Sequence, residues 1–457
     1  MRKATFTAEV IMGNRLVILG AGESGVGAAI LGKLQGYEVF VSDSSLIKDN
    51  YKQELISLEI EFEEAKHNEK RILQADEVMK SPGIPEKNEL VKKIRSKGIN
   101  IISEIEWAFR FKGDSKIVGI TGSNGKTTTT SLLYHICKHA GLECAMVGNI
   151  GYSFARQVAQ DPKALYIVEI SSFQLDDIKT FRANTAILTN ITEDHLDRYE
   201  YNFENYINSK FRITLNQTAA DDFIYSADDP VTMKFLDRHS FKSNLLPFTM
   251  KEELNLGSFI KDEKMTVTVD EETFTMSIYD FALKGKHNQY NTMAAGIASS
   301  RLGIRKNIIR EAIQSFESLE HRMEFVATVK GVEFINDSKA TNVNSTWYAL
   351  ENMEKPTILI MGGIDKGNDY TQIQELVKEK VKAIVCMGLD NRHIYEFFGK
   401  DVEHIADTKS AEEAVQAAFN FAEKDDIVLL SPACASFDLF KNYEDRGKQY
   451  KEAVMKL

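Results

Sequence analysis

The sequence predicts an α/β protein of three domains, each built around a mostly parallel sheet. Short apolar runs are followed by glycine-rich turns, amphipathic segments separate these runs, and this pattern restarts twice along the chain. A length of 457 residues also exceeds what one hydrophobic core serves. We place the domains at residues 1–112, 113–320 and 321–457.

The first domain begins with a buried strand at Leu16–Leu19. A Gly-Ala-Gly-Glu-Ser-Gly turn follows at 20–25, then a helical segment and a second strand at Glu38–Ser42, which ends at Asp43. This arrangement matches the fingerprint of a Rossmann-like dinucleotide site. A nicotinamide cofactor and the diphosphate of another nucleotide fit it equally well. A third turn, 81–85, follows a strand at 77–79.

The second domain opens with a strand at 116–120 and the loop Thr-Gly-Ser-Asn-Gly-Lys-Thr-Thr at 121–128, before a helix at 127–140. Such a loop directs backbone N–H groups at phosphate oxygens, and the helix N-terminus adds positive potential. Lys126 is expected to reach the outer phosphates and Thr127 to ligate Mg²⁺. Ile120 occupies the first glycine position of the strict P-loop pattern, so a plain glycine turn stays an alternative.

Further strands of this domain are predicted at 165–170 and 186–191, and a helix at 205–215. The segments 265–269 and 274–278 alternate with period two, which predicts a small antiparallel appendage outside the main sheet. Glu169 ends a strand, where its carboxylate suits Mg²⁺ or a salt bridge. His195 lies in a polar cluster after the next strand and is a candidate ligand of a second metal. Lys210, by its pattern alone, is a solvated charge.

The third domain has predicted strands at 357–361, 383–387 and 428–430, and a helix at 410–423. The pair His321-Arg322 and the run 337–342 lie where this domain begins, and two turns of ligand-binding type follow at 362–367 and 431–436. A guanidinium at a domain junction is suited to the charge of a phosphate undergoing transfer.

Composition argues against several classes of binding partner. The net charge of −11 argues against a nucleic-acid surface, and no apolar run is long enough for a membrane span. Four cysteines without a C-x-x-C pair indicate free thiols in a reducing compartment, so we expect a cytoplasmic protein without zinc. We also expect a monomer. We also expect Met12, directly before the first strand, to be the true start.

Together these motifs resemble those of the Mur ligases, which assemble peptidoglycan precursors, and in particular the branch of that family that adds D-glutamate. The resemblance covers the chain from about residue 15 onward. Its motifs are the loop at 121–127, Gly148-Asn149-Ile150-Gly151, the segments 169–175, 192–199 and 285–288, His321-Arg322, the run 337–342, and the stretch from 430–436 to Arg446-Gly447. The departure at Ile120 is shared by the wider family.

The resemblance implies that the first domain holds the UDP of a nucleotide-sugar substrate rather than NAD. Ser24, Asp43 and Gly83 would contact it, and Asn149 and Asp194 would place its muramoyl-alanine end. Family members often carry a basic residue two places after Asp43, where this chain has Ser45.

The resemblance further implies ATP and two Mg²⁺ ions in the second domain. Lys126, His195, Lys210 and Arg322 would be catalytic, and Lys210 matches a lysine that the family carbamylates with CO₂. The implied metal ligands are Thr127, Glu169, His195 and carbamylated Lys210. The implied ATP contacts are Gly122, Asn124, Gly125, Lys126, Thr127, Thr128, Asn291, Arg322 and Asp337.

D-Glutamate would bind in the third domain. The matching positions are Thr341, Lys366, Ser436 and Tyr443, the last more often Phe in the family. The implied reaction is ATP-dependent amide formation through an acyl phosphate. A sister Mur ligase, a folate-polyglutamate-type ligase, an NAD-dependent dehydrogenase and a non-catalytic nucleotide-binding regulator are the alternatives.

Overall fold

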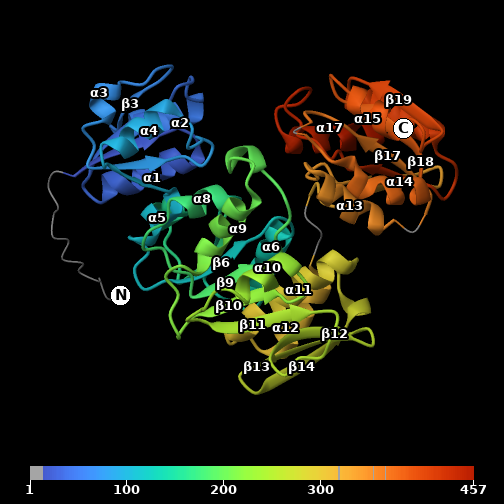
Figure 1. Cartoon of the computed structure of the whole chain (residues 1–457), viewed down its shortest axis with the longest axis horizontal. Helices are drawn as coiled ribbons and strands as arrows, with labels where there is room; N and C mark the ends of the chain where they lie inside the picture. Colours follow the sequence, from blue (N-terminus) through green and yellow to red (C-terminus); the bar gives the residue numbers. More distant parts are fainter. Residues whose placement is uncertain (1–13, 317–319, 354, 366) are drawn as a thin grey trace. The chain divides into compact units, whose positions relative to one another are not determined.

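A computed structural model describes residues 14–316, 320–353, 355–365 and 367–457 of the chain. It has three sheets, drawn in Figure 1 in blue, in green to yellow, and in orange to red. The chain divides into two compact units. The first holds the chain up to Phe281 together with Asn288–Ser315, and the second holds Ala282–His287 and everything from Phe316. The predicted α/β class with three sheets is confirmed, while the domain boundaries stay a prediction. Met12 lies outside the described residues.

Residues 14–109 form a parallel sheet in the order β3-β2-β1-β4-β5. The predicted strands at 16–19, 38–42 and 77–79 are confirmed. The strands are β1 (Arg15–Leu19), β2 (Glu38–Ser42), β3 (Glu61–Glu63), β4 (Glu77–Lys80) and β5 (Asn100–Ile102), and the helices are α1 (Glu23–Leu34), α2 (Asp49–Ser57), α3 (Glu69–Ile72), α4 (Glu89–Ser96) and α5 (Glu104–Phe109). Because β1 lies between β2 and β4, the glycine-rich turn after β1 stands where the strand order reverses, which is where open α/β sheets bind ligands.

Residues 116–315 contain the second sheet, in the order β14-β13-β12-β11-β10-β9-β6-β8-β7. Its strands are β6 (Lys116–Thr121), β7 (Cys144–Gly148), β8 (Leu165–Glu169), β9 (Thr185–Leu188), β10 (Asp222–Ser226), β11 (Asn244–Thr249), β12 (Gly257–Lys261), β13 (Lys264–Val269) and β14 (Glu272–Ser277). Its helices are α6 (Lys126–His139), α7 (Phe154–Gln160), α8 (Ser172–Asp176), α9 (Phe203–Phe211), α10 (Pro230–Leu236), α11 (Lys286–Arg301) and α12 (Lys306–Ser315), with 3₁₀ turns at Leu196–Arg198, Arg212–Thr214 and Ile278–Asp280. The loop at 121–128 follows β6, between β8 and β9, again where the strand order reverses.

The expectation that 265–269 and 274–278 form a separate appendage is wrong. These segments are β13 and β14, and they continue the main sheet at its edge. The predicted antiparallel pairing of these two segments is confirmed. Strand β12, which was not predicted, pairs antiparallel with β13 and in parallel with β11, through Phe248–Ser258 and Thr249–Phe259. This short pairing leaves no periodic signal in the sequence. The predicted strand at 186–191 also ends early, at Leu188, because Thr189, Asn190 and Thr192 bond to the phosphate loop.

The described part of residues 320–457 forms the third sheet, in the order β15-β16-β20-β17-β18-β19, with β15 antiparallel to β16 and the other neighbouring pairs parallel. The strands are β15 (Glu324–Val329), β16 (Val332–Asn336), β17 (Thr357–Met361), β18 (Val381–Met387), β19 (His404–Thr408) and β20 (Ile427–Leu430). The helices are α13 (Val343–Glu351), α14 (Gln374–Lys380), α15 (Arg392–Phe398), α16 (Ala411–Phe421) and α17 (Tyr443–Val454), with a 3₁₀ turn at Tyr370–Ile373. The predicted helix at 410–423 is α16, capped by the Ser410 hydroxyl.

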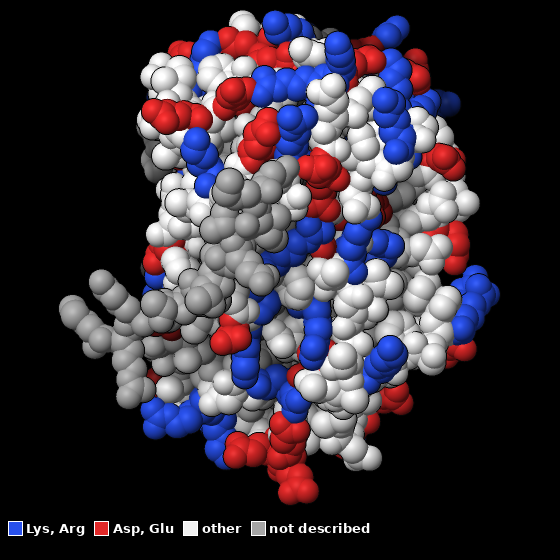
Figure 2. Space-filling model, turned by 90° about the vertical axis from the view of Figure 1, so that its left-hand side faces the viewer, with Lys and Arg blue, Asp and Glu red and all other residues white. Residues whose placement is uncertain are grey.

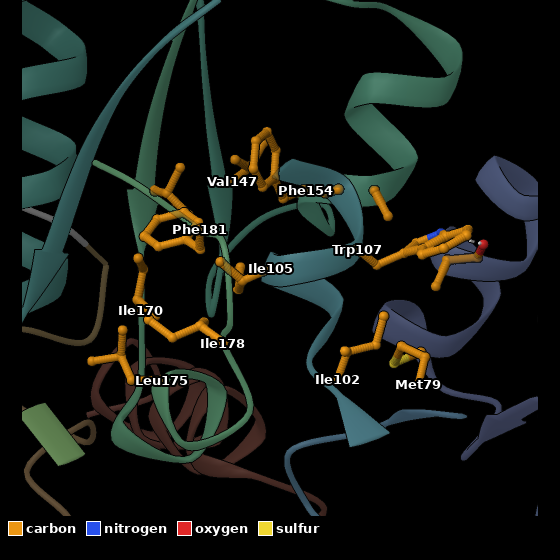
Figure 3. Close-up of a cluster of buried hydrophobic side chains, with 14 of the residues drawn as sticks. Met79, Ile102, Ile105, Trp107, Val147, Phe154, Ile170, Leu175, Ile178 and Phe181 are labelled. Carbon is orange, nitrogen blue, oxygen red and sulfur yellow. Dashed lines mark hydrogen bonds between the residues drawn. The ribbon is translucent and has the colours of Figure 1, made fainter. Parts of the chain in front are cut away.

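The first two sheets belong to one unit because a continuous apolar cluster joins them. Helix α5 supplies its middle. Figure 3 shows Ile105 of α5 on the side of the cluster that holds Phe181, and Trp107 of α5 on the side that holds Met79. The Trp107 ring also donates from Nε1 to the carbonyl of Ala28 at 3.2 Å. The burial of these large side chains holds the two sheets together, so the glycine-rich turn after β1 and the phosphate loop after β6 belong to one unit.

Two carboxylates on α5 add polar links across the same boundary. Glu106 accepts hydrogen bonds from the backbone N–H groups of residues 179, 180 and 181 at 2.8–2.9 Å, and one from the Thr180 hydroxyl at 2.7 Å. Glu104 accepts a bond from the Ala155 N–H, while its second oxygen is buried with no hydrogen-bond partner among the described residues. Hydrogen-bond donors therefore surround the Glu106 carboxylate, whereas the Glu104 carboxylate is buried with one oxygen unsatisfied by the described residues.

Basic and acidic side chains are interspersed over the face shown in Figure 2. Among the described residues, none of the helices has the length and apolar character that crossing a membrane requires.

The two α5 carboxylates generate a prediction on stability. Burial raises the pKa of Glu104 to about 8, from an ordinary value of 4.5. The folded protein therefore binds more protons than the unfolded chain between these values, so this group's contribution to stability falls as pH rises through that window. Glu104→Gln keeps an acceptor for Ala155 without a charge. We expect its thermal midpoint to exceed the parent's by a few degrees at pH 8 and to match it near pH 5.

Glu106→Gln is the matched control. Burial alone would raise the pKa of Glu106, but the bonds from Thr180 and the three backbone amides outweigh it, and the pKa is lowered. Its stabilisation is present at neutral pH and is lost as pH falls through the folded-state pKa. We expect Glu106→Gln to destabilise by about 2 kcal/mol at pH 8 and by less in acid. Parallel pH profiles for the two variants would contradict this assignment.

Candidate active site

The loop between β6 and α6 has the backbone of a phosphate cradle. Gly122 has φ +148° and Gly125, the N-cap of α6, has φ +79°. Each glycine also meets a neighbour closely. A Cβ at Gly122 would lie 1.9 Å from Oγ1 of Thr189, and one at Gly125 would lie 2.3 Å from Oδ1 of Asn291. Both positions therefore require glycine for conformation and for space.

The segment after β9 holds this loop in place. The N–H of Asn124 donates to Oδ1 of Asn190 at 3.0 Å, and the Thr189 hydroxyl donates to the Asn124 carbonyl at 2.5 Å. The Ser123 hydroxyl donates to the Thr192 carbonyl and accepts from its N–H, both at 2.9 Å. These bonds leave the loop little conformational freedom, so its amides are preorganised for an anion.

Asn291 on α11 packs against the phosphate loop. Its Oδ1 accepts a bond from the Thr129 hydroxyl at 3.2 Å, and its Nδ2 donates to Asn288 at 3.2 Å. The side chain is buried against Gly125. Contact between Asn291 and an adenine ring stays a prediction.

Two lysines share one backbone carbonyl of the loop. Nζ of Lys126 and Nζ of Lys210 each donate to the Gly122 oxygen at 2.7 Å, and Lys126 also donates to Ser123 at 2.9 Å. Lys210 is 2% exposed and lies 4.5 Å from the Tyr206 ring centroid. Burial, reinforced by the charge of Lys126, lowers the pKa of Lys210 well below its ordinary value. The alternative that Lys210 is a solvated charge is therefore wrong.

Glu169 has a buried carboxylate oxygen suited to coordinate a cation. It ends β8 and is buried, and its Oε1 accepts a bond from Nδ2 of Asn149 at 2.9 Å. Its Oε2 is also buried and, within the described residues, accepts no hydrogen bond. An unsatisfied buried carboxylate oxygen beside a phosphate loop fits a hard divalent cation such as Mg²⁺.

His195 and Asp194 lie in the segment after β9. His195 adopts a left-handed conformation, φ +53°, at the start of the 3₁₀ turn. Its ring stands edge-on to Phe173 at 5.1 Å, and its Nε2 lies 3.6 Å from the Asp194 carboxylate. Among the described residues, no three His, Cys, Asp or Glu side chains lie close enough to form a metal site. The predicted ligand set contains only two residues of these kinds, Glu169 and His195, and stays a prediction.

In the first sheet, Asp43 supports the glycine-rich turn. Its Oδ2 accepts the Ala21 N–H at 2.7 Å and its Oδ1 accepts the Ser45 N–H at 2.8 Å. Gly20 has φ +94°, and a Cβ there would meet the Ser81 hydroxyl at 2.6 Å. The turns at 20–25 and 81–85 are thus packed together, and at this edge Ser24 is half-buried and Gly83 is exposed.

The second unit contains the predicted Arg322–Asp337 pair. Oδ2 of Asp337 accepts a bond from the Ser431 hydroxyl at 2.9 Å, and its Oδ1 accepts the Met323 N–H at 3.3 Å. Burial raises the pKa of Asp337 to about 7, against the opposing effects of Ser431 and Arg322. His321 is bonded to Asn336 at 2.9 Å and lies against Gly447, where a Cβ would be 2.3 Å from Nδ1.

The predicted D-glutamate positions lie near the ends of β16, β17 and β20. Ser436 is buried in a loop that pairs with 362–364 through Ile364 and Ala435. The Tyr443 carbonyl accepts a bond from the Ser338 hydroxyl at 2.8 Å, and the Lys339 ammonium lies 5.0 Å from its ring centroid. Thr341 is half-buried, and Lys366 lies outside the described residues.

Among the predicted site residues, the structure brings together Lys126 and Lys210, and also Asn149 and Glu169. The sequence analysis missed Tyr206, whose hydroxyl lies 3.1 Å from the Ser123 Oγ and whose ring contacts Lys210. Its spacing of four residues before Lys210 on α9 puts both on one helix face, which is the one signal that could have found it.

Comparison with known families assigns three parts of the chain. Residues 14–103 match the MurD-like N-terminal domain of Mur ligases, residues 120–299 the Mur ligase middle domain, and residues 321–434 the Mur ligase glutamate ligase domain.

Curated relatives match nearly the whole chain. The UDP-N-acetylmuramoylalanine–D-glutamate ligase of Christiangramia forsetii is 53% identical, over 98% of this chain and 100% of its own length. The ligase of the same name from Bacteroides fragilis is 53% identical, over 97% of this chain and 100% of its own.

Solved structures share the fold. A pseudomurein peptide ligase type C from Methanothermus fervidus has a TM-score of 0.62 and 20% identity, covering 97% of this chain and 100% of its own. A MurF ligase from Thermotoga maritima in complex with ADP has a TM-score of 0.61 and 15% identity, covering 92% of this chain and 95% of its own.

The glycine geometry generates a prediction on nucleotide binding. Gly125→Ala would drive a methyl group against Asn291, which must move and distort the loop. We expect the Kd for ATP, measured by calorimetry, to rise by about tenfold or more. Gly141→Ala is the matched control, since Gly141 has φ +76° at the other end of α6 and nothing within 4 Å of a Cβ. Both variants should lose about 1 kcal/mol of stability. Equal ATP affinity in the two variants would refute the steric argument.

Proposed function

This chain belongs to the Mur ligase family, and we propose that it joins D-glutamate to UDP-N-acetylmuramoyl-L-alanine, with conversion of ATP to ADP and phosphate. This reaction builds a peptidoglycan precursor, and we assign it to a cytoplasmic monomer. The observation that carries the proposal is the 53% identity to ligases of that name over almost the entire chain. The preorganised phosphate loop with two lysines on one carbonyl supports it.

In the first step, an oxygen of the L-alanyl carboxylate would attack the γ-phosphorus of ATP. A carboxylate O–P bond forms, the bond from phosphorus to the β–γ bridging oxygen breaks, and ADP leaves. Loop amides and the Lys126 ammonium would neutralise charge on the transferring group. Arg322, from the second unit, would spread this charge further, while Asp337 would engage the nucleotide.

In the second step, the amine of D-glutamate would attack the carbonyl carbon of the acyl phosphate. A C–N bond forms, the C–O bond to phosphate breaks, inorganic phosphate leaves, and the amine proton passes to solvent. Thr341, Lys366, Ser436 and Tyr443 would hold the amino acid. Exclusion of water from the acyl phosphate would protect it from hydrolysis.

Two Mg²⁺ ions complete the proposed site. Thr127 and Glu169 would hold one of them, and His195 and carbamylated Lys210 the other. When bound, the ions supply positive charge against the phosphate oxygens. The lowered pKa of Lys210 supports its carbamylation, because a neutral amine adds to CO₂ to give a carbamate and one proton.

The UDP-sugar would lie along the carboxyl edge of the first sheet and reach toward the phosphate loop. Ser24 and Gly83 would contact UDP directly, while Asp43 would act by holding the turn through Ala21. Asn149 and Asp194 would place the muramoyl-alanine end, and Asn149 also orients Glu169.

Phosphate release tests the function. Purified protein with ATP, Mg²⁺ and UDP-N-acetylmuramoyl-L-alanine should release phosphate on addition of D-glutamate, with little response to L-glutamate, L-lysine or diaminopimelate. Mass spectrometry should detect the amide product. A response to another amino acid would identify a sister ligase instead. Enhancement of NADH fluorescence without UDP-sugar binding would identify a dehydrogenase.

Lys126→Ala should lower the rate of ADP formation by about a hundredfold or more, because one cation is lost where charge develops. Lys138→Ala, in the last turn of the same helix, is the control and should retain the parent rate. ADP formation at the parent rate in the Lys126→Ala protein would rule out the proposed phosphoryl transfer.

Carbamylation of Lys210 has its own test. Protein equilibrated with ¹³C-bicarbonate should show a carbamate signal by NMR, and Lys210→Arg should lack it because an arginine stays protonated. Removal of CO₂ should lower kcat severalfold, with recovery on adding bicarbonate. An activity independent of CO₂, together with no carbamate signal, would contradict the assignment.

A further inference from the structure

Arg198 connects the turn after β4 with the segment that carries His195. Its NH2 donates to the Pro82 carbonyl at 3.1 Å and its NH1 to the Gly83 carbonyl at 3.4 Å. On its other side, the guanidinium lies 4.3 Å from the ring centroid of Phe173. A planar guanidinium can stack and donate to two acceptors at once, which an ammonium cannot do.

The Phe173 ring contacts His195 as well as the Arg198 guanidinium. It stands edge-on to the imidazole at 5.1 Å and stacks on Tyr199 at 5.8 Å. The backbone N–H of Arg198 also donates to the His195 carbonyl at 2.9 Å. Since His195 has a left-handed backbone, the orientation of its ring depends on these neighbours rather than on a regular element.

The same two hydrogen bonds orient the turn after β4. A trans peptide is planar, so a carbonyl and the following N–H point in opposite directions. With the Pro82 carbonyl directed at Arg198, the Gly83 N–H is directed away from it. The Ile84 N–H closes the turn onto the Ser81 carbonyl at 3.1 Å. Gly83 is exposed, so a ligand can approach this turn from solvent.

We propose that Arg198 is a positioning residue that couples UDP-sugar binding at the Gly83 amide to the orientation of His195 at the reacting end of the same substrate. The inference rests on the proposed function for the identity of that substrate. It goes beyond that function because the proposed reaction gives Arg198 no role. Arg198 would act indirectly, through its contacts with Gly83 and Phe173.

Other bonds hold the two sheets of this unit together independently of Arg198. Asp177 is buried and pairs with Lys80 at 3.1 Å and with Arg95 at 2.6 Å, and its carbonyl accepts the Ser103 N–H at 3.1 Å. Loss of Arg198 therefore leaves the packing of the unit in place. Its effect should appear in substrate affinity and rate rather than in folding.

The test compares Arg198→Ala and Arg198→Lys with the parent enzyme. For Arg198→Ala we expect the KM for UDP-N-acetylmuramoyl-L-alanine to rise about tenfold and kcat to fall about tenfold, since charged hydrogen bonds of this kind are lost. The KM values for ATP and D-glutamate should change less than twofold. Arg198→Lys keeps the charge and can still donate hydrogen bonds but lacks the planar group that stacks on Phe173, so its KM should lie between the two.

Arg212→Ala is the matched control. Arg212 also donates to two backbone carbonyls, those of Leu175 and Ile178, each at 2.7 Å, away from the turn after β4. We expect this variant to lower the thermal midpoint at least as much as Arg198→Ala, without changing the KM for the UDP-sugar. An Arg198→Ala enzyme with a lowered kcat and unchanged KM for every substrate would overturn the inference.

Calorimetry with UDP alone separates this inference from the proposed function. If the parent enzyme binds UDP and Arg198→Ala weakens that binding severalfold, Arg198 positions the turn whichever amino acid is ligated. Equal UDP affinity in both proteins overturns the role of Arg198, whereas absence of D-glutamate-dependent phosphate release by the parent overturns the function.

Discussion

The carbonyl of Gly122 accepts hydrogen bonds from Lys126 and Lys210, and the arrangement of the site depends on it. Only a glycine with φ +148° directs this carbonyl as needed, and Thr189 leaves no space for a side chain there. Burial, together with repulsion from the Lys126 ammonium, lowers the pKa of Lys210, so Lys210 favours its neutral form. The predicted phosphate loop is connected directly to Lys210 through the Gly122 carbonyl.

Hydrogen bonds connect the phosphate loop to the segments around it. Ser123 and Asn124 are bonded to residues 189–192, and Tyr206 joins Ser123 to the helix that carries Lys210. The same segment after β9 leads to His195 and then to Arg198, which reaches the turn after β4. One rigid unit thus contains both the phosphate loop and the candidate UDP edge, while Arg322, Asp337 and the amino-acid positions belong to the other unit. A reaction with three substrates is consistent with such a division.

Much of the fold could be predicted because the buried parallel strands are uninterrupted apolar runs bounded by glycine turns, as at 16–19, 116–120 and 357–361. Strands β3 and β5 were not predicted because three-residue edge strands carry no periodic pattern. The separate appendage was wrong because the pairing of β12 with β11 depends on two residue pairs far apart in the sequence. In the site, residue types and spacing pointed to Lys126 and Glu169, and only the family resemblance pointed to Lys210. Neither indicated how the polar atoms of these residues are satisfied.

The sequence by itself determined the order of the elements, the positions of the glycine turns and the family to which the chain is related. These properties are local, since they depend on residue type and spacing. Only the tertiary structure decided that Asp43 bonds to Ala21, that Asn291 supports Gly125, and that Arg198 meets Gly83. Each is a contact between segments distant in sequence, and it exists because buried polar groups take whichever partner the packed sheets bring within reach.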